Sequence, residues 1–228
     1  ATVDTFARRP FVVFEKDMAQ SAAPVGAQEE LKIAAEATRV RAASARLRPG
    51  QPPCQVLMYQ TVGSLLPMYS MSRWFAARPA LLLHGDDGEL ITTNMSLGCP
   101  SHRAGQPCGA PVPVPWVDFS QPAAVSGWVS QLHQWVANKS VDGVALDGNP
   151  FDDEWVHSIG GSPGVLATVA SPAKRAAFLK GVNASQAQLG ALIAASGGVL
   201  MANGLHKKGD NGMLFEEWCG EHSYLRRP

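Results

Sequence analysis

Short apolar runs that end on a polar or acidic residue recur along the chain, and segments of helical periodicity separate most of them. The clearest run spans 142–149, where Val-Ala-Leu is followed at once by Asp147 and a glycine. Unbroken apolar runs of this length are typical of strands buried on both faces, as in parallel sheets. The same pattern predicts further strands at 11–17, 55–59, 80–84, 199–204 and 212–218.

Helical periodicity predicts covering helices between these strands. One spans about 28–48 and ends at Pro49-Gly50, and a second begins after Ser120 as N-cap, with Trp128 and Trp135 at core spacing. A third spans about 171–195. An irregular Pro-, Gly- and Cys-rich stretch at 94–115 has the length of a lid or a binding loop. The residues expected on the apolar face of the first helix are Leu31, Ala34, Ala35, Thr38, Ala42 and Ala45.

Alternating strands and helices predict an α/β fold with a parallel sheet, and we expect the (β/α)8 TIM-barrel type. A length of 228 residues fits one such domain over residues 1–228. The pattern accounts for about six strands of the eight that this barrel contains. We therefore expect an incomplete, apparently truncated barrel, closed by a missing C-terminal segment or by a partner.

Charge and cysteine content narrow the class of protein. Nineteen basic and nineteen acidic residues give a formal net charge of zero, so neither nucleic acid nor an anionic membrane is expected as the principal partner. Cys99 and Cys108 bracket the irregular stretch and are candidates for a disulfide, and Asn94, Asn138 and Asn183 begin formal glycosylation triplets. We expect a secreted or extracytoplasmic glycoprotein whose signal peptide is absent from this chain.

Acidic residues at two strand ends supply the candidate chemistry. In a parallel barrel these ends meet at one rim, so Asp147 and Glu216 become candidates for the paired carboxylates that cleave a glycosidic bond. One carboxyl must donate a proton and the other must attack or activate water, without metal or cofactor. Two alternatives stay open: Asp147 is a turn residue before Gly148, and a one-residue register shift exchanges Glu216 for Glu217. The other expected substrate-binding residues are Glu15, Lys16, Tyr59, Asn149, Trp155, Asn203 and Glu217.

Several short motifs resemble a known group of barrels. They occur in order at 14–16, 56–59, 85–88, 117–122, 142–149, 203–204 and 215–218. Together they resemble the hypothetical glycoside-hydrolase-like barrels of the family-15-like group, which look distantly related to polygalactosaminidase-type and α-galactosidase-type barrels. The resemblance implies a carbohydrate substrate, with a carboxylate after strand four (Asp147) as nucleophile or base and one after strand six (Glu216) as acid.

Three hypotheses follow from the sequence. The first is a glycoside hydrolase that acts on a poly- or oligosaccharide. The second is a non-catalytic glycan-binding barrel, a pseudoenzyme that keeps the rim and has lost turnover. The third is an unrelated α/β domain in which these acids only cap helices and fix turns.

Overall fold

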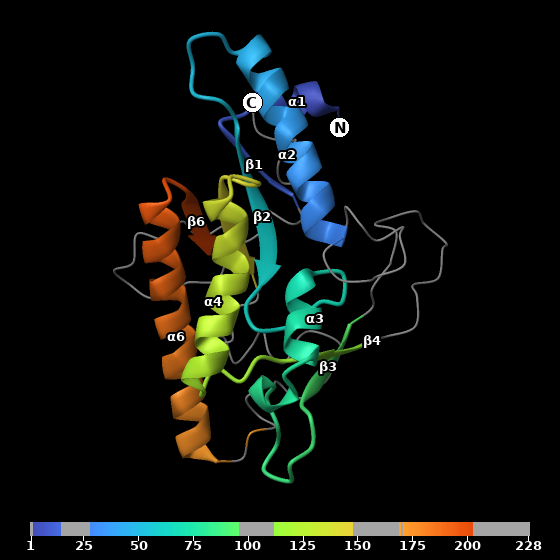
Figure 1. The fold of residues 1–228 in the computed structure, drawn as a ribbon, viewed down its shortest axis with the longest axis vertical. Coiled ribbons are helices and arrows are strands. Elements are labelled where there is room, and N and C mark those ends of the chain that lie inside the picture. The colour runs from blue at the N-terminus through green and yellow to red at the C-terminus, as the bar shows by residue number, and fades with distance from the viewer. Residues whose placement is uncertain (1, 15–27, 96–111, 148–168, 170, 203–228) are drawn as a thin grey trace, which may run out of the picture.

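The protein contains a four-stranded parallel sheet with helices packed against it (Figure 1). The structure is a computed structural model that describes residues 2–14, 28–95, 112–147, 169 and 171–202. The strands are β1 (Phe11–Phe14), β2 (Gln55–Thr61), β5 (Gly143–Asp147) and β6 (Val199–Ala202), and their order in the sheet is β1-β2-β5-β6. The prediction of an α/β fold with a parallel sheet is confirmed.

The strand order follows the chain order without reversal. Parallel crossovers are almost always right-handed, so an unreversed order places the crossover helices on the same face of the sheet. These helices are α2 (Gln28–Leu47), α4 (Pro122–Ala137) and α6 (Pro172–Ala195), and α4 and α6 lie side by side (Figure 1). One-sided winding is the local arrangement found in barrels, although these four strands form an open sheet and do not close.

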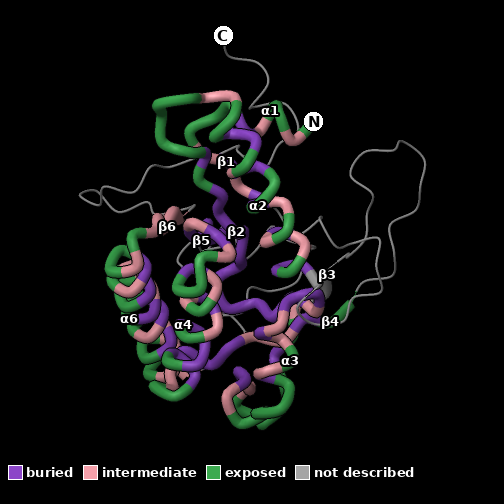
Figure 2. Tube along the Cα trace, turned by 45° about the horizontal axis from the view of Figure 1, so that its top comes forward, coloured by how far each residue is buried: buried purple, intermediate pink, exposed green. Residues whose placement is uncertain are grey.

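Alternation along the central strands separates two faces of the sheet. One face joins the main apolar core with the helices, and β2 is buried along most of its length (Figure 2). On the other face, the register aligns Tyr59 with Ala145 and Thr61 with Asp147. On the two central strands, the alternating residues Val56, Met58, Val144 and Leu146 belong to this core, and Tyr59 near the end of β2 belongs to the same cluster.

Helix α4 confirms its predicted core residues. Trp128 in α4 is fully buried and Trp135 is half-buried against the core, as the periodicity predicted. The N-cap of α4 is Gln121 instead of Ser120, whose hydroxyl donates to Asp118. In α6 the Ser171 side chain accepts from the Lys174 amide, a standard N-cap.

The predicted apolar face of α2 is wrong. Leu31 is 59% exposed, whereas Ile33, Ala37 and Val40 are fully buried. The helix carries small or apolar residues on two faces, and the one with the larger branched side chains packs inward. A short helix, α1 (Val3–Ala7), contacts α2 on its flank.

The strand predicted at 80–84 is also wrong. This segment begins as the 3-10 helix η2 (Pro79–Leu81), and Leu82 and His84 form only isolated antiparallel bridges, to Val117 and Leu90. It follows α3 (Ser70–Ala76). Consequently β5 is the third strand of the parallel sheet instead of the fourth. Both ends of the irregular stretch 94–115 belong to an unpredicted antiparallel pair, β3 (Thr92–Met95) and β4 (Val112–Pro115).

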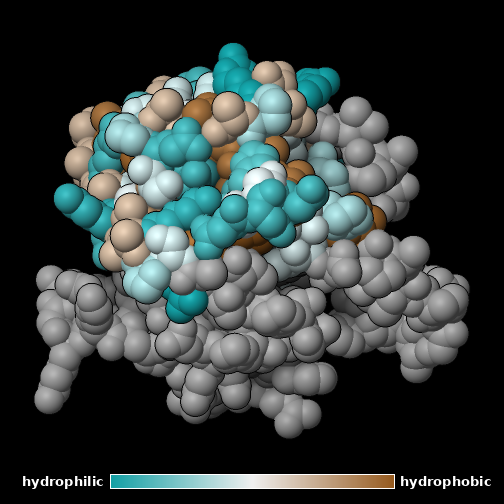
Figure 3. All heavy atoms as spheres, turned by 90° about the horizontal axis from the view of Figure 1, so that it is seen from below, coloured by the Kyte–Doolittle hydropathy of each residue, from teal (hydrophilic) through white to brown (hydrophobic). Residues whose placement is uncertain are grey.

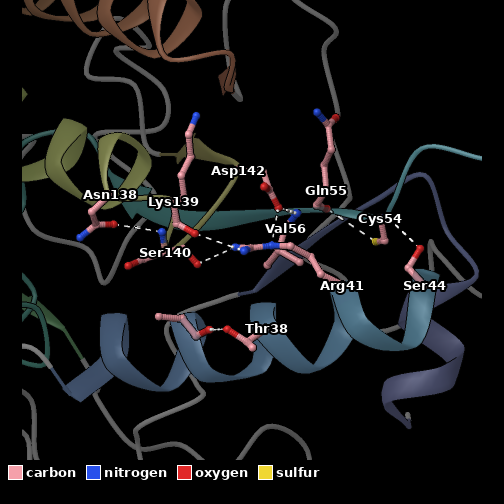
Figure 4. Close-up of polar contacts among 11 residues, drawn as sticks. Thr38, Arg41, Ser44, Cys54, Gln55, Val56, Asn138, Lys139, Ser140 and Asp142 are labelled. Carbon is pink, nitrogen blue, oxygen red and sulfur yellow. Dashed lines mark hydrogen bonds and ion pairs between the residues drawn. The ribbon is translucent and has the colours of Figure 1, made fainter. Parts of the chain in front are cut away.

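An ion pair anchors α2 at the amino end of the sheet (Figure 4). Asp142 Oδ2 accepts from the Val56 amide at 2.8 Å and from Arg41 Nε at 3.2 Å. Arg41 also donates to the carbonyls of Lys139 and Ser140. A single guanidinium therefore joins α2 to the turn before β5, at the end of the sheet opposite Asp147.

Candidate functional site

Asp147 lies at the carboxyl end of β5, and a tyrosine from β2 contacts it. The Tyr59 hydroxyl donates to Asp147 Oδ2 at 2.8 Å. Because Tyr59 pairs with Ala145 and Thr61 with Asp147, both side chains point to the sheet face opposite the helices. Tyr59 is 3% exposed and Asp147 is 7% exposed. The structure thus brings together two residues that the sequence predicted for the site.

The backbone of Asp147 also fixes the loop that follows β2. The Asp147 carbonyl accepts from the Val62 amide at 2.8 Å, and the Thr61 hydroxyl donates to the Ser64 carbonyl. Gly63 is needed there because its φ is +87° and a Cβ would lie 2.8 Å from the Phe119 ring. The strand end that carries Asp147 is therefore tied to β2 by backbone as well as side-chain bonds.

A second tyrosine reaches the site from the start of α3. The Tyr69 hydroxyl donates to the Tyr59 carbonyl at 2.8 Å, and the Tyr69 side chain is 1% exposed. The β1–β2 register ends at the Phe14–Met58 pair, one residue before this carbonyl. Tyr69 thus continues the hydrogen bonding of β2 beyond its described pairing with β1.

Glu30, in the first turn of α2, is a buried carboxyl beside this group. Its Oε1 accepts from the Ser70 amide at 2.8 Å and from the Ser70 hydroxyl at 2.7 Å. Its Oε2 is buried and has no hydrogen-bond partner within the described part of the chain. Burial raises the pKa of Glu30, and the bonds from Ser70 only partly oppose that shift.

The carboxyl ends of the strands face one end of the molecule, toward which β2 points in Figure 1. Seen from that side, the described surface is mostly hydrophilic, with small separate apolar areas (Figure 3).

Among the described residues no group of three or more His, Cys, Asp or Glu is placed to hold a metal ion. No described helix is long and apolar enough to cross a membrane.

All the other predicted site residues lie outside the described part of the chain. These are Glu15, Lys16, Asn149, Trp155, Asn203, Glu216 and Glu217, together with the disulfide candidates Cys99 and Cys108. Cys54, the one described cysteine, is a buried free thiol. Sequence reasoning missed Tyr69 and Glu30, since neither stands at a strand end. For Glu30 the local sequence shows a glutamate in the first turn of a helix. Such a glutamate ordinarily indicates a solvent-exposed charge near the positive end of the helix dipole.

No protein-family model matches the chain, and no curated protein matches it either. Solved structures similar to it include the maltogenic alpha-amylase AmyB from Thermotoga neapolitana, with a TM-score of 0.43 and 11% identity over 85% of this chain and 37% of that one. The GH31 dextranase FjDex31A from Flavobacterium johnsoniae has a TM-score of 0.49 and 10% identity over 87% and 22%. The alpha-L-fucosidase isoenzyme 2 from Paenibacillus thiaminolyticus has 0.44 and 11% over 86% and 32%.

These structural neighbours are glycoside hydrolases. The chain spans less than two-fifths of the length of each. Because all three TM-scores are below 0.5, we infer a function only from the residues of this chain and their geometry.

Proposed function

We propose that this chain is a glycoside hydrolase domain that cleaves a poly- or oligosaccharide, with Asp147 as nucleophile or base and Glu216 as general acid. One observation carries the proposal: the Asp147 carboxylate ends a strand of a parallel sheet wound on one side and accepts the Tyr59 hydroxyl. Barrel enzymes place their reacting groups at this end of the strands. The motifs named above support an assignment to the family-15-like group.

In this reaction Asp147, Tyr59 and the general acid each have a separate role. Attack on an anomeric carbon requires a carboxylate held at a fixed angle, and a hydrogen bond to one oxygen limits its rotation. Tyr59 supplies that bond from the neighbouring strand. The leaving oxygen must receive a proton from a second carboxyl, which the sequence pattern assigns to Glu216 and, with a register shift, to Glu217.

The proposal includes the surroundings of the pair. The sequence pattern places Glu15, Lys16, Asn149, Trp155 and Asn203 around the sugar as hydrogen-bonding and stacking residues. An extracytoplasmic location and a Cys99–Cys108 disulfide belong to the same proposal and are supported by the cysteine spacing. Mass spectrometry of the unreduced protein tests the disulfide.

The test is hydrolysis of a panel of oligosaccharides and aryl glycosides by the unmodified chain and by Asp147→Asn. The variant preserves size and one acceptor oxygen but removes the charge, so we expect the rate to fall at least about a thousandfold. Asp87→Asn is the matched control, because Asp87 is exposed in a turn where it accepts the Glu89 amide. Equal activity in Asp147→Asn and the control would overturn the assignment.

A glycan-binding role without turnover is the second candidate, because the burial of Asp147 counts against attack by its carboxylate on a sugar. A carboxylate that is 7% exposed and already bonded to Tyr59 offers little surface to an incoming sugar. Calorimetric titration with the same oligosaccharides separates the two candidates. Binding by a chain that cleaves no member of the panel supports this second role.

A further inference from the structure

A path of hydrogen bonds, joined by the covalent chain at residues 69–70 and within Tyr59, runs from the first turn of α2 to Asp147. Glu30 accepts from Ser70, the adjacent Tyr69 donates to the Tyr59 carbonyl, and Tyr59 donates to Asp147. The side chains of Glu30, Tyr69, Tyr59 and Asp147 are all buried, with exposures of 2%, 1%, 3% and 7%. Water therefore competes little for these bonds, and an unmade bond there is costly.

At the start of α3, Glu30 supplies the capping acceptor that the N-cap residue Tyr69 does not supply. Tyr69 is the N-cap residue of α3, yet its side chain makes no capping bond to that helix. The acceptor for the Ser70 amide comes instead from Glu30, forty residues earlier in α2. Tyr69 consequently directs its hydroxyl away from its own helix and toward β2.

We infer that Glu30 and Tyr69 are positioning residues for the Tyr59–Asp147 pair: Glu30 fixes the first turn of α3, and Tyr69 fixes the end of β2 from which Tyr59 reaches Asp147. The inference rests on the proposed function in that it assigns the reacting carboxylate to Asp147. Neither residue touches the reacting atoms.

The burial of Glu30 favours a positioning role over simple helix capping. A cap requires only one accepted amide, and exposed Ser, Thr, Asp or Asn supply it at small cost. Glu30 instead buries a carboxyl and leaves Oε2 without a partner in the described part of the chain, which is energetically unfavourable. Real proteins break local rules of this kind mainly at functional sites, where another requirement outweighs the cost.

The experiment follows the Asp147 carboxyl directly by carbon-13 NMR of protein labelled at aspartate, with Asp147→Asn used to assign the signal. Tyr69→Phe deletes one hydroxyl and retains the buried ring, Glu30→Ala removes the acceptor for Ser70, and Glu30→Gln retains it. Thr38→Ala is the matched control, because Thr38 is exposed in α2 and its hydroxyl donates only within that helix, to the Ala34 carbonyl.

We expect the Asp147 signal to move in Tyr69→Phe and Glu30→Ala and to stay in place in Glu30→Gln and Thr38→Ala. On a cleaved glycan, Tyr69→Phe should lower kcat about ten- to a hundredfold with KM nearly unchanged, since misplacement affects the reacting geometry more than binding. The same NMR result in a chain that cleaves no glycan refutes the hydrolase and still supports the positioning role. An unmoved signal in folded Tyr69→Phe overturns the inference, even if that variant is less stable.

Discussion

The contact between Asp142 and the amino end of β2 allows a quantitative prediction about stability. Asp142→Ala removes the acceptor of the Val56 amide and the partner of Arg41 Nε, whereas Asp142→Asn retains an acceptor oxygen and loses only the charge. Val56 is fully buried, so water cannot replace the lost acceptor. The two variants therefore separate the hydrogen bond from the ion pair.

The magnitude follows from the two contacts. An unsatisfied buried amide costs about 1–3 kcal/mol of stability. The Arg41–Asp142 pair, with side chains 27% and 28% exposed, adds about 0.2–1 kcal/mol. We expect a loss of about 3 kcal/mol for Asp142→Ala and about 1 kcal/mol for Asp142→Asn. With a urea m-value of about 3 kcal/mol/M, the midpoints fall by about 1 M and about 0.3 M.

Urea unfolding at pH 7, followed by tryptophan fluorescence and circular dichroism, measures both losses. Arg41→Leu, alone and combined with Asp142→Asn, gives the coupling energy of the ion pair in a double-mutant cycle. Equal midpoints for Asp142→Ala and Asp142→Asn would refute the importance of the Val56 bond. Any activity per folded molecule should be unchanged, because this contact lies at the end of the sheet opposite Asp147.

Three further predictions concern buried groups and close packing. Burial raises the pKa of Glu30 above 4.5, so its contribution to stability is fully present below pH 4.5 and is lost as pH rises through the folded-state value; Glu30→Gln should remove this decline in urea titrations between pH 4 and 8. Burial raises the pKa of Cys54 from 9.0 to about 11, so stability should fall between pH 9 and 11 in the unmodified chain and less in Cys54→Ala, as thermal unfolding can measure. A Cβ on Gly181 would lie 1.7 Å from the Phe119 carbonyl oxygen, so Gly181→Ala should lower the Tm by several degrees despite better helix propensity. Gly190→Ala in the same helix, where the nearest atom is a flexible Leu200 methyl at 3.3 Å, should change the Tm little, and equal effects of the two substitutions would contradict the close approach of α6 to Phe119.

The pattern of apolar residues along the chain was sufficient to locate the strands of the parallel sheet and its long helices. Apolar runs located β1, β2, β5 and β6, and helical spacing located α2, α4 and α6. Asp147 was identified as the last residue of its strand for the same reason: the change from apolar to acidic is visible in the chain itself. Such signals are strong because burial along one element imposes them directly on the sequence.

Choices between two apolar surfaces, or between two neighbours, required the tertiary structure. Either face of α2 could have packed inward, and only the fit of Ile33 and Val40 into the core decided between them. In the segment 80–84, Leu82 and Leu83 are buried, yet β2 pairs with β5, so this segment is excluded from the parallel sheet.

The sequence by itself determined an α/β chain with a parallel sheet and a carboxylate at the end of one central strand. Only the tertiary structure decided that Tyr59 donates to that carboxylate, because the contact depends on the register between strands far apart in the chain. The same holds for Glu30 and Ser70, which are forty residues apart in the chain and meet where the first turn of α2 reaches the start of α3. Periodicity records which residues are buried, but the partner of a buried polar group is set by geometry that only the folded chain contains.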